Sequence, residues 1–142
     1  MAQSDKDLLL KDLCARLPYG VKIAMPGLWD KKITVESLNE MFKGDDGLYR
    51  ANGSGMLIEY IKPYLFPLSS MTEEQYYEMQ NISGEDCLEH MEVEKEWRNN
   101  SPFTRLPLYQ HRVIEFFHKH HFDYRGLIPM GLAIDATNKN IY

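Results

Sequence analysis

Closely spaced turn signals divide residues 19–62 into segments too short for a long helix or a long strand. Proline and glycine provide these signals at Pro26-Gly27, Gly44–Gly47, Asn52–Gly55 and Pro63, because they fix or free the backbone where a chain reverses. Between the turns, apolar residues alternate with polar or small ones, as in half-buried strands. The sequence therefore predicts a small, strongly bent antiparallel sheet over residues 19–62, either open or partly closed into a barrel.

Residues 33–42 fit two kinds of secondary structure. Ile33 and Val35 alternate with polar residues as in a strand, whereas Val35, Leu38 and Met41 recur at the spacing of a short helix. We favour a strand, because the neighbouring short strands need pairing partners and an isolated hairpin is only marginally stable.

An amphipathic helix is predicted over residues 5–17. Its apolar stripe recurs at helical spacing and consists of Leu9, Leu10, Leu13, Cys14 and Leu17. Asp12 and Arg16 are expected on the opposite face. Ser4–Asp7 resembles a capping box, and Pro18 ends the helix because the residue before a proline is pushed out of the α region.

The second half of the chain alternates extended and helical segments. Tyr64–Leu68 is predicted to be an extended apolar strap across the sheet, because Pro67 lacks the N–H that a central strand needs. A capping box at Thr72–Gln75 opens a helix over about 73–80, and periodic apolar residues predict another over 109–120. A short strand follows at 132–134. The expected fold class is α+β: an N-terminal helix, a small bent antiparallel sheet, helices packed across it and a short C-terminal strand.

Length and composition fit a single domain over residues 1–142. With 44% hydrophobic residues, the chain has enough apolar material for its own core. The N-terminus lacks the apolar run of a signal peptide, and no segment approaches the roughly 18 apolar residues of a membrane span. Cys14 and Cys87 are far apart and in different contexts. We therefore expect a cytoplasmic protein that does not insert into membranes.

Charge argues against one class of partner. Sixteen basic and twenty-one acidic residues give a net charge of −5 without a basic cluster. Nucleic acid is therefore disfavoured, since phosphate contacts need a basic patch. The segment from about residue 80 to residue 108 is expected to be a variable, acidic insertion. It is either a solvated segment or an acidic contact surface.

Three strings of sequence resemble a known family. They are Leu8–Val21, Ile61–Glu74 and His120–Ile134. The second begins with Ile61-Lys62-Pro63-Tyr64-Leu65-Phe66-Pro67-Leu68, and the third begins with His120-His121-Phe122-Asp123-Tyr124-Arg125-Gly126. In this order they resemble small uncharacterised proteins carried by phages, prophages and mobile elements of gut anaerobic bacteria. The resemblance implies a genetic setting for the chain and no particular chemistry.

Three histidines and an aspartate lie close together at His118, His120, His121 and Asp123. His118, His121 and Asp123 are candidate metal ligands, since His118 and His121 share a helix face. A zinc site needs three or four converging ligands, and the His-Glu-x-x-His signature is absent. We therefore favour a chain without a metal or other cofactor, in which His121 is buried and hydrogen-bonded and His118 and His120 are solvated.

The adjacent residues Asp123, Tyr124 and Arg125 are, with His121, the candidate ligand-binding residues. Arg125 and Tyr124 could present a guanidinium fork and a hydroxyl to an anion. In the alternative that we favour, Asp123 caps a turn and Arg125 pairs with a carboxylate elsewhere in the chain.

No catalytic residue is assigned, because no phosphate-binding loop or nucleophile elbow is present. We expect a non-enzymatic accessory or interaction protein of a phage or mobile element. It would bind another protein, from the host or the mobile element, or sequester a small ligand. The alternative is a metal-dependent hydrolase or nuclease that uses His118, His121 and Asp123. The oligomeric state is left open.

Overall fold

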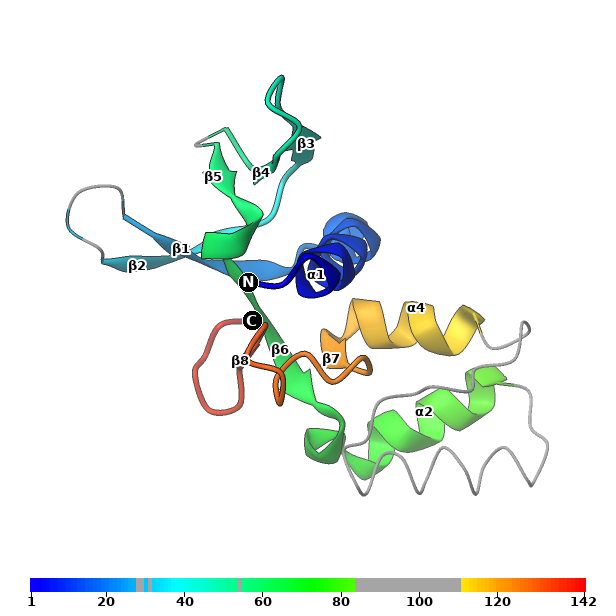
Figure 1. Cartoon of the computed structure of the whole chain (residues 1–142). Helices are drawn as coiled ribbons and strands as arrows, with labels where there is room; N and C mark the ends of the chain where they lie inside the picture. Colours follow the sequence, from blue (N-terminus) through cyan, green and yellow to red (C-terminus); the bar gives the residue numbers. More distant parts are fainter. Residues whose placement is uncertain (28–29, 31, 54, 84–110) are drawn as a thin grey trace.

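The computed structural model describes residues 1–27, 30, 32–53, 55–83 and 111–142. It confirms an α+β fold with an N-terminal helix, two sheets, later helices and a short C-terminal strand (Figure 1). The helices are α1 (Gln3–Arg16), α2 (Glu73–Ser83) and α4 (His111–Lys119). The strands are β1 (Lys22–Pro26), β2 (Ile33–Ser37), β3 (Met41–Lys43), β4 (Tyr49–Ala51), β5 (Met56–Leu57), β6 (Lys62–Pro67), β7 (Phe122–Asp123) and β8 (Ile134–Asp135). Residues 84–108 of the predicted acidic insertion, Cys87 among them, lie outside the described residues.

Strand β6 is the centre of a five-stranded sheet. It pairs antiparallel with β1, which pairs with β2, and it pairs parallel with β7 and β8. The prediction of a strap over residues 64–68 is therefore wrong. The strand accommodates Pro63 and Pro67 because residues that lie between the two prolines make hydrogen bonds to the neighbouring segments. Phe66 N donates to His121 O at 2.8 Å, and Leu65 O accepts from Ala136 N at 2.8 Å.

Strands β3, β4 and β5 form a separate antiparallel sheet. Residues 19–62 are therefore divided between two sheets, and the described strands do not close into a barrel. Residues 33–37 and 41–43 are strands, which confirms the strand alternative for this stretch. The buried Asn52 stabilises the segment that connects β2 of one sheet to β3 of the other. Its side chain accepts from Asn39 N (2.7 Å) and donates to Ser37 O (2.9 Å).

The buried face of helix α1 includes Leu9 and Leu13 of the predicted stripe but is shifted from it toward Asp12 and Arg16. Leu9 and Leu13 lie in the main core with residues of β1, but Asp12 and Arg16 are also fully buried, and Cys14 is exposed. At about 100° per residue, positions 9, 12, 13 and 16 share one side of a helix. The apolar residues alone did not show that two charged residues belong to that side. The helix begins at Gln3 without a side-chain cap, so the capping box predicted at Ser4–Asp7 is wrong.

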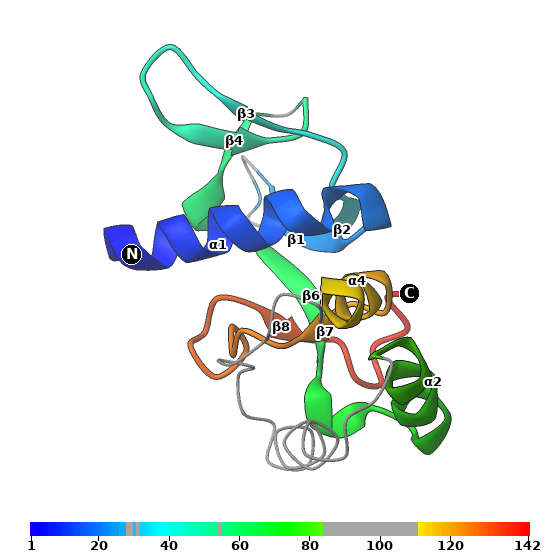
Figure 2. The same cartoon turned by 90° about the vertical axis from the view of Figure 1, so that its right-hand side faces the viewer.

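Helices α2 and α4 lie side by side, and α4 lies between α2 and α1 (Figure 2). The capping box predicted for α2 is confirmed: Thr72 N donates to Gln75 Oε1 (2.9 Å), and Gln75 N donates to Thr72 Oγ1 (3.1 Å). The helices and β7 bury a second core of Leu68, Met71, Tyr76, Met79, Val113, Phe116, Phe117, Phe122 and Tyr124. None of the described helices is long and apolar enough to cross a membrane.

Candidate functional site

A buried ionic cluster joins α1 to the C-terminal segment. Asp12 accepts from Arg16 Nε at 2.8 Å through Oδ2 and from Arg125 Nε at 3.0 Å through Oδ1. Arg16 Nη2 also donates to Phe122 O at 2.6 Å. Asp12 and Arg16 have no exposed side-chain surface, so each charge depends on the other for its stability in the interior. Arg125 pairs with a distant carboxylate, as the structural alternative predicted.

Asp123 and Tyr124 are buried beside this cluster. Asp123 accepts from Leu127 N (2.9 Å) through Oδ1 and from Ile128 N (2.8 Å) through Oδ2, so it caps the turn that follows β7. Burial raises the pKa of Asp123, and the two backbone bonds oppose that shift. The Tyr124 hydroxyl forms a 2.8 Å hydrogen bond with His118 Nε2. The carboxylate of Asp123 and the hydroxyl of Tyr124 therefore form their hydrogen bonds with other groups of the same chain.

The structure separates the three candidate metal ligands. His118 contacts Tyr124, the Asp123 oxygens contact backbone amides, and the His121 ring stacks on Tyr142 at 3.8 Å between centroids. Within the described ranges, no group of three or more His, Cys, Asp and Glu side chains is placed to hold a metal ion. The prediction that His118 is solvated is wrong: His118 is buried and its ring bonds to Tyr124 beside the second core. His120 and His121 are both partly buried, and His121 Nδ1 has no hydrogen-bond partner among the described residues.

His121 instead belongs to a surface pocket of about 380 Å³, which we call the His pocket. This volume is within the range of small-molecule sites. The lining residues come from the end of β6, the start of α2, the end of α4 and the C-terminal segment: Phe66, Ser70, Thr72, Gln75, Lys119, His120, His121, Phe122, Thr137, Asn138 and Tyr142. The described lining contains one lysine, several hydroxyl and amide groups and no acidic side chain.

Tyr142 forms a fixed aromatic wall of the His pocket. Its hydroxyl donates to Tyr64 O at 2.7 Å and accepts from Lys22 N at 2.9 Å. Burial raises the pKa of Tyr142 to about 12, so the hydroxyl stays protonated. One face of its ring stacks on His121, with an interplanar angle of 11°.

The pKa values of both histidines of the pocket are lowered, so both rings are mainly neutral at pH 7. Burial lowers the pKa of His121 to about 4, assisted by the positive charge of Arg16. Burial also lowers the pKa of His120, and nearby Lys119 acts in the same direction against Glu78. The pocket therefore presents imidazoles, each with one N–H donor and one acceptor nitrogen.

The burial of individual nitrogen atoms assigns the tautomers. His120 Nε2 and His121 Nδ1 are buried without a hydrogen-bond partner, whereas the other nitrogen of each ring is not. A buried N–H without an acceptor is less tolerable than a buried acceptor without a donor. We therefore place the protons on His120 Nδ1 and His121 Nε2. In these tautomers both rings can donate to a ligand.

The backbone at His121 is unusual for a histidine. It follows α4 with φ +61°, in the left-handed region, at a position where helices usually have glycine or asparagine. A non-glycine residue held there costs about 1 kcal/mol or more, and such strain is concentrated at functional sites.

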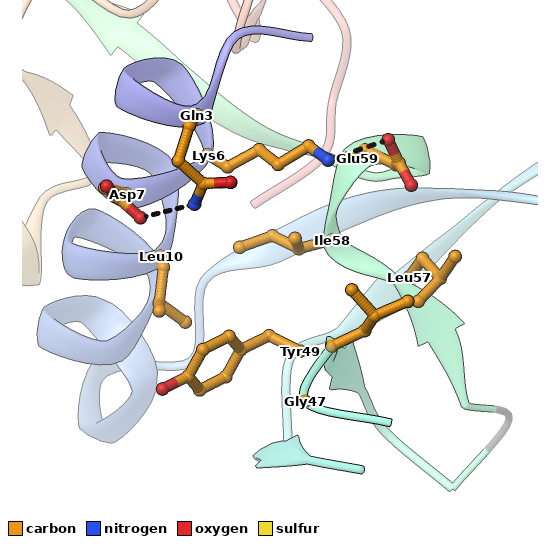
Figure 3. A pocket seen from close by; sticks show the side chains of 10 residues that line it. Gln3, Lys6, Asp7, Leu10, Gly47, Tyr49, Leu57, Ile58 and Glu59 are labelled. Carbon is orange, nitrogen blue, oxygen red and sulfur yellow. Dashed lines mark hydrogen bonds and ion pairs between the residues drawn. The ribbon is translucent and has the colours of Figure 1, made fainter. Parts of the chain in front are cut away.

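A second hollow lies between α1 and the three-stranded sheet (Figure 3). It has a volume of about 120 Å³, with Leu10, Leu57 and Ile58 among its lining residues. Its charged rim is already paired, because Lys6 lies 3.3 Å from Glu59. We consider this hollow a weaker candidate for a ligand site.

No protein-family model, curated protein or solved structure matches this chain. Of the four residues predicted to bind a ligand, His121 lines the His pocket, while Asp123, Tyr124 and Arg125 do not. The prediction missed His120, Lys119 and Tyr142 as lining residues. The run of basic and aromatic residues at the end of a helix was the available signal for the first two. No local pattern indicates Tyr142, because it reaches the pocket through its bond to β6.

Proposed function

We propose that the chain is a non-enzymatic accessory protein that binds a small anionic ligand with a planar part in the His pocket. The imidazole N–H donors of His120 and His121, assigned to His120 Nδ1 and His121 Nε2, carry this proposal. Both rings line the pocket, both are mainly neutral, and neither makes a hydrogen bond within the described structure. The buried nitrogen of each ring stays an unpaired acceptor, whereas the N–H on its other nitrogen can donate to a ligand in the pocket. A hydrogen bond from such a donor to an ionised acceptor is stronger than one between neutral groups.

The lining favours an anion over a cation. Lys119 contributes a positive charge, the imidazoles contribute two N–H donors, and no described acidic side chain lines the pocket. A hydrogen bond to a charged group contributes about 1.5–3 kcal/mol. Phosphate and carboxylate groups are the anions that such donors recognise.

The aromatic lining favours a ligand with a planar part. Tyr142 and Phe66 are partly exposed, and Tyr142 is held by two backbone hydrogen bonds. A ring that stacks on a fixed tyrosine gains contact area without ordering a flexible side chain. The genetic setting that we propose is that of the resembling family, in which sequestering a small ligand would serve a phage or mobile element.

The metal-dependent hydrolase is the less favoured alternative. His118, His121 and Asp123 have separate partners, and His118 and Asp123 are buried away from the His pocket. A hydrolytic metal needs convergent ligands and an open coordination position.

A ligand screen with matched variants tests the proposal. Thermal shift with inorganic phosphate, benzoate and the mononucleotides would identify a probe, and calorimetry at pH 7.5 would measure its affinity. Lys119→Ala should weaken binding about tenfold, equivalent to about 1.4 kcal/mol. The exposed Lys11 on α1 provides a control, because Lys11→Ala makes the same charge change away from the pocket. The proposal would be rejected if no probe binds, or if both variants weaken binding equally.

A further inference from the structure

Strand β2 leaves one edge of the five-stranded sheet open. It is an outermost strand, paired with β1 and with no other described strand. The β1–β2 hairpin extends from the body on the side remote from α2 and α4 (Figure 1). Ile33 is 60% exposed and Val35 is 47% exposed. An exposed apolar edge of this kind is a template for pairing with another strand.

Two backbone hydrogen bonds define which backbone groups of β2 face away from β1. Gly27 N donates to Lys32 O, and Leu38 N donates to Val21 O, so residues 32 and 38 face β1. Backbone groups alternate between the two sides along an antiparallel strand. The N–H and C=O groups of Ile33 and Val35 therefore point outward from the sheet.

We propose that β2 pairs with β2 of a second copy of this chain, antiparallel and centred on Thr34. In this register Ile33 lies opposite the partner's Val35, and these are the residues whose backbone groups point outward. Two such pairs form by symmetry, and each exchanges two hydrogen bonds. Apolar residues directly opposite one another on antiparallel strands also stabilise the pair.

Charge complementarity selects the partner and the register. With Thr34 on the axis, Lys32 lies opposite the partner's Glu36 on the same face as the two threonines. Neither Lys32 nor Glu36 forms an ion pair within the described residues, so both are available. A shift of the axis to Val35 would place Lys32 opposite the partner's Leu38 and would lose both ion pairs. The strand is thus complementary to itself in one register, as a two-fold interface requires.

The proposed dimer is weak and leaves the His pocket accessible. One strand per protomer buries much less than the roughly 1,200 Å² of a stable interface. No residue of β2 lines the His pocket, so two pockets remain available in the dimer. Ligand binding and dimerisation are therefore separately testable.

Sedimentation equilibrium of the full chain gives the first test. The protein concentration should extend to about 1 mM, because a small interface binds weakly. The mean mass should rise with concentration toward that of a dimer. A constant monomer mass over the whole range would overturn the proposal. Val35→Pro removes an outward N–H without removing a bond to β1, a change that edge strands accept. It should abolish the rise in mass while its circular dichroism stays like that of the wild type.

Charge reversal provides a second test that does not depend on a backbone change. Lys32→Glu and Glu36→Lys each place like charges opposite one another, so each should lower the association constant. The double variant restores two opposite-charge pairs and should recover the association of the wild type. If Val35→Pro still dimerises, or if the double variant is no better than the single ones, the dimer does not use this register.

Discussion

Arg125 Nε lies 3.0 Å from Asp12 Oδ1, which links the first helix to the C-terminal segment across a sequence separation of 113 residues. Arg16, one turn further along α1, continues the link through its bond to Phe122 O. The segment that forms β7 and leads to the His pocket is therefore held by α1. We expect changes in this cluster to affect the stability of the whole fold.

Asp12→Ala should destabilise the protein strongly. It would leave Arg16 buried without its carboxylate, and breaking a buried ion pair by removing one partner costs about 3–5 kcal/mol. Urea unfolding measures the change. Lys11→Ala, at the adjacent exposed position, should change stability by less than about 0.5 kcal/mol. Equal effects of the two substitutions would show that the cluster does not stabilise the fold.

Asp123→Ala should lower the melting temperature, because Leu127 N and Ile128 N would lose their acceptor. The expected loss is about 0.5–2 kcal/mol, as for the removal of a helix N-cap. The melting temperatures of the wild type, Asp123→Ala and Asp123→Asn give the measurement, since asparagine keeps one of the two acceptor oxygens. A variant that melts at or above the wild-type temperature would return Asp123 to the candidate ligand-binding residues.

Stability should fall as the solution is acidified from pH 7 to pH 5. Burial, with Arg16 next in importance, lowers the pKa of His118 to about 4, whereas an unfolded histidine has a pKa of about 6.5. The unfolded state therefore binds more protons between these values, and the stabilising effect of the neutral ring is lost as pH falls. His118→Gln should have a lower free energy of unfolding than the wild type at pH 7. Between pH 7 and pH 5, however, that free energy should fall by about 1–2 kcal/mol less in the variant than in the wild type. Urea unfolding of both proteins at the two pH values provides the comparison.

His121→Gly should separate stability from binding. Glycine adopts the left-handed conformation without strain, a gain of about 1 kcal/mol, which offsets the loss of about 0.5–1.5 kcal/mol from ring stacking on Tyr142. We expect nearly unchanged stability and ligand binding weakened by about tenfold or more, since a hydrogen bond to a charged group contributes about 1.5–3 kcal/mol. His121→Val should be clearly less stable, because a β-branched residue is strongly disfavoured at φ +61°. If His121→Gly binds the probe as the wild type does, the His121 ring has no role in the pocket.

Local features of the fold were predictable where the chemistry is local. The capping box of Thr72 and Gln75 and the cap provided by Asp123 connect residues close in sequence. The failures concern distant partners. Arg16 could not be placed in the interior without its bond to Phe122, and Pro67 could not be placed in a central strand without β7.

The candidate site shows the same limit. The position of His121 at a helix end was predictable, since α4 has a clear apolar period. The burial of His118 was not, because it depends on the Tyr124 hydroxyl and the second core. Tyr142 joins the site only through the sheet, so no sequence pattern near the histidines indicates it.

Nuclear magnetic resonance of the imidazole nitrogens tests the central claim most directly. At pH 7, His120 should be protonated at Nδ1 and His121 at Nε2. Addition of a binding probe such as adenosine monophosphate should shift those two signals and leave those of the buried His118 unchanged. Titration of His120 and His121 with an ordinary pKa of about 6.5, and no response of either ring to any anion in the screen, would contradict the proposed ligand site.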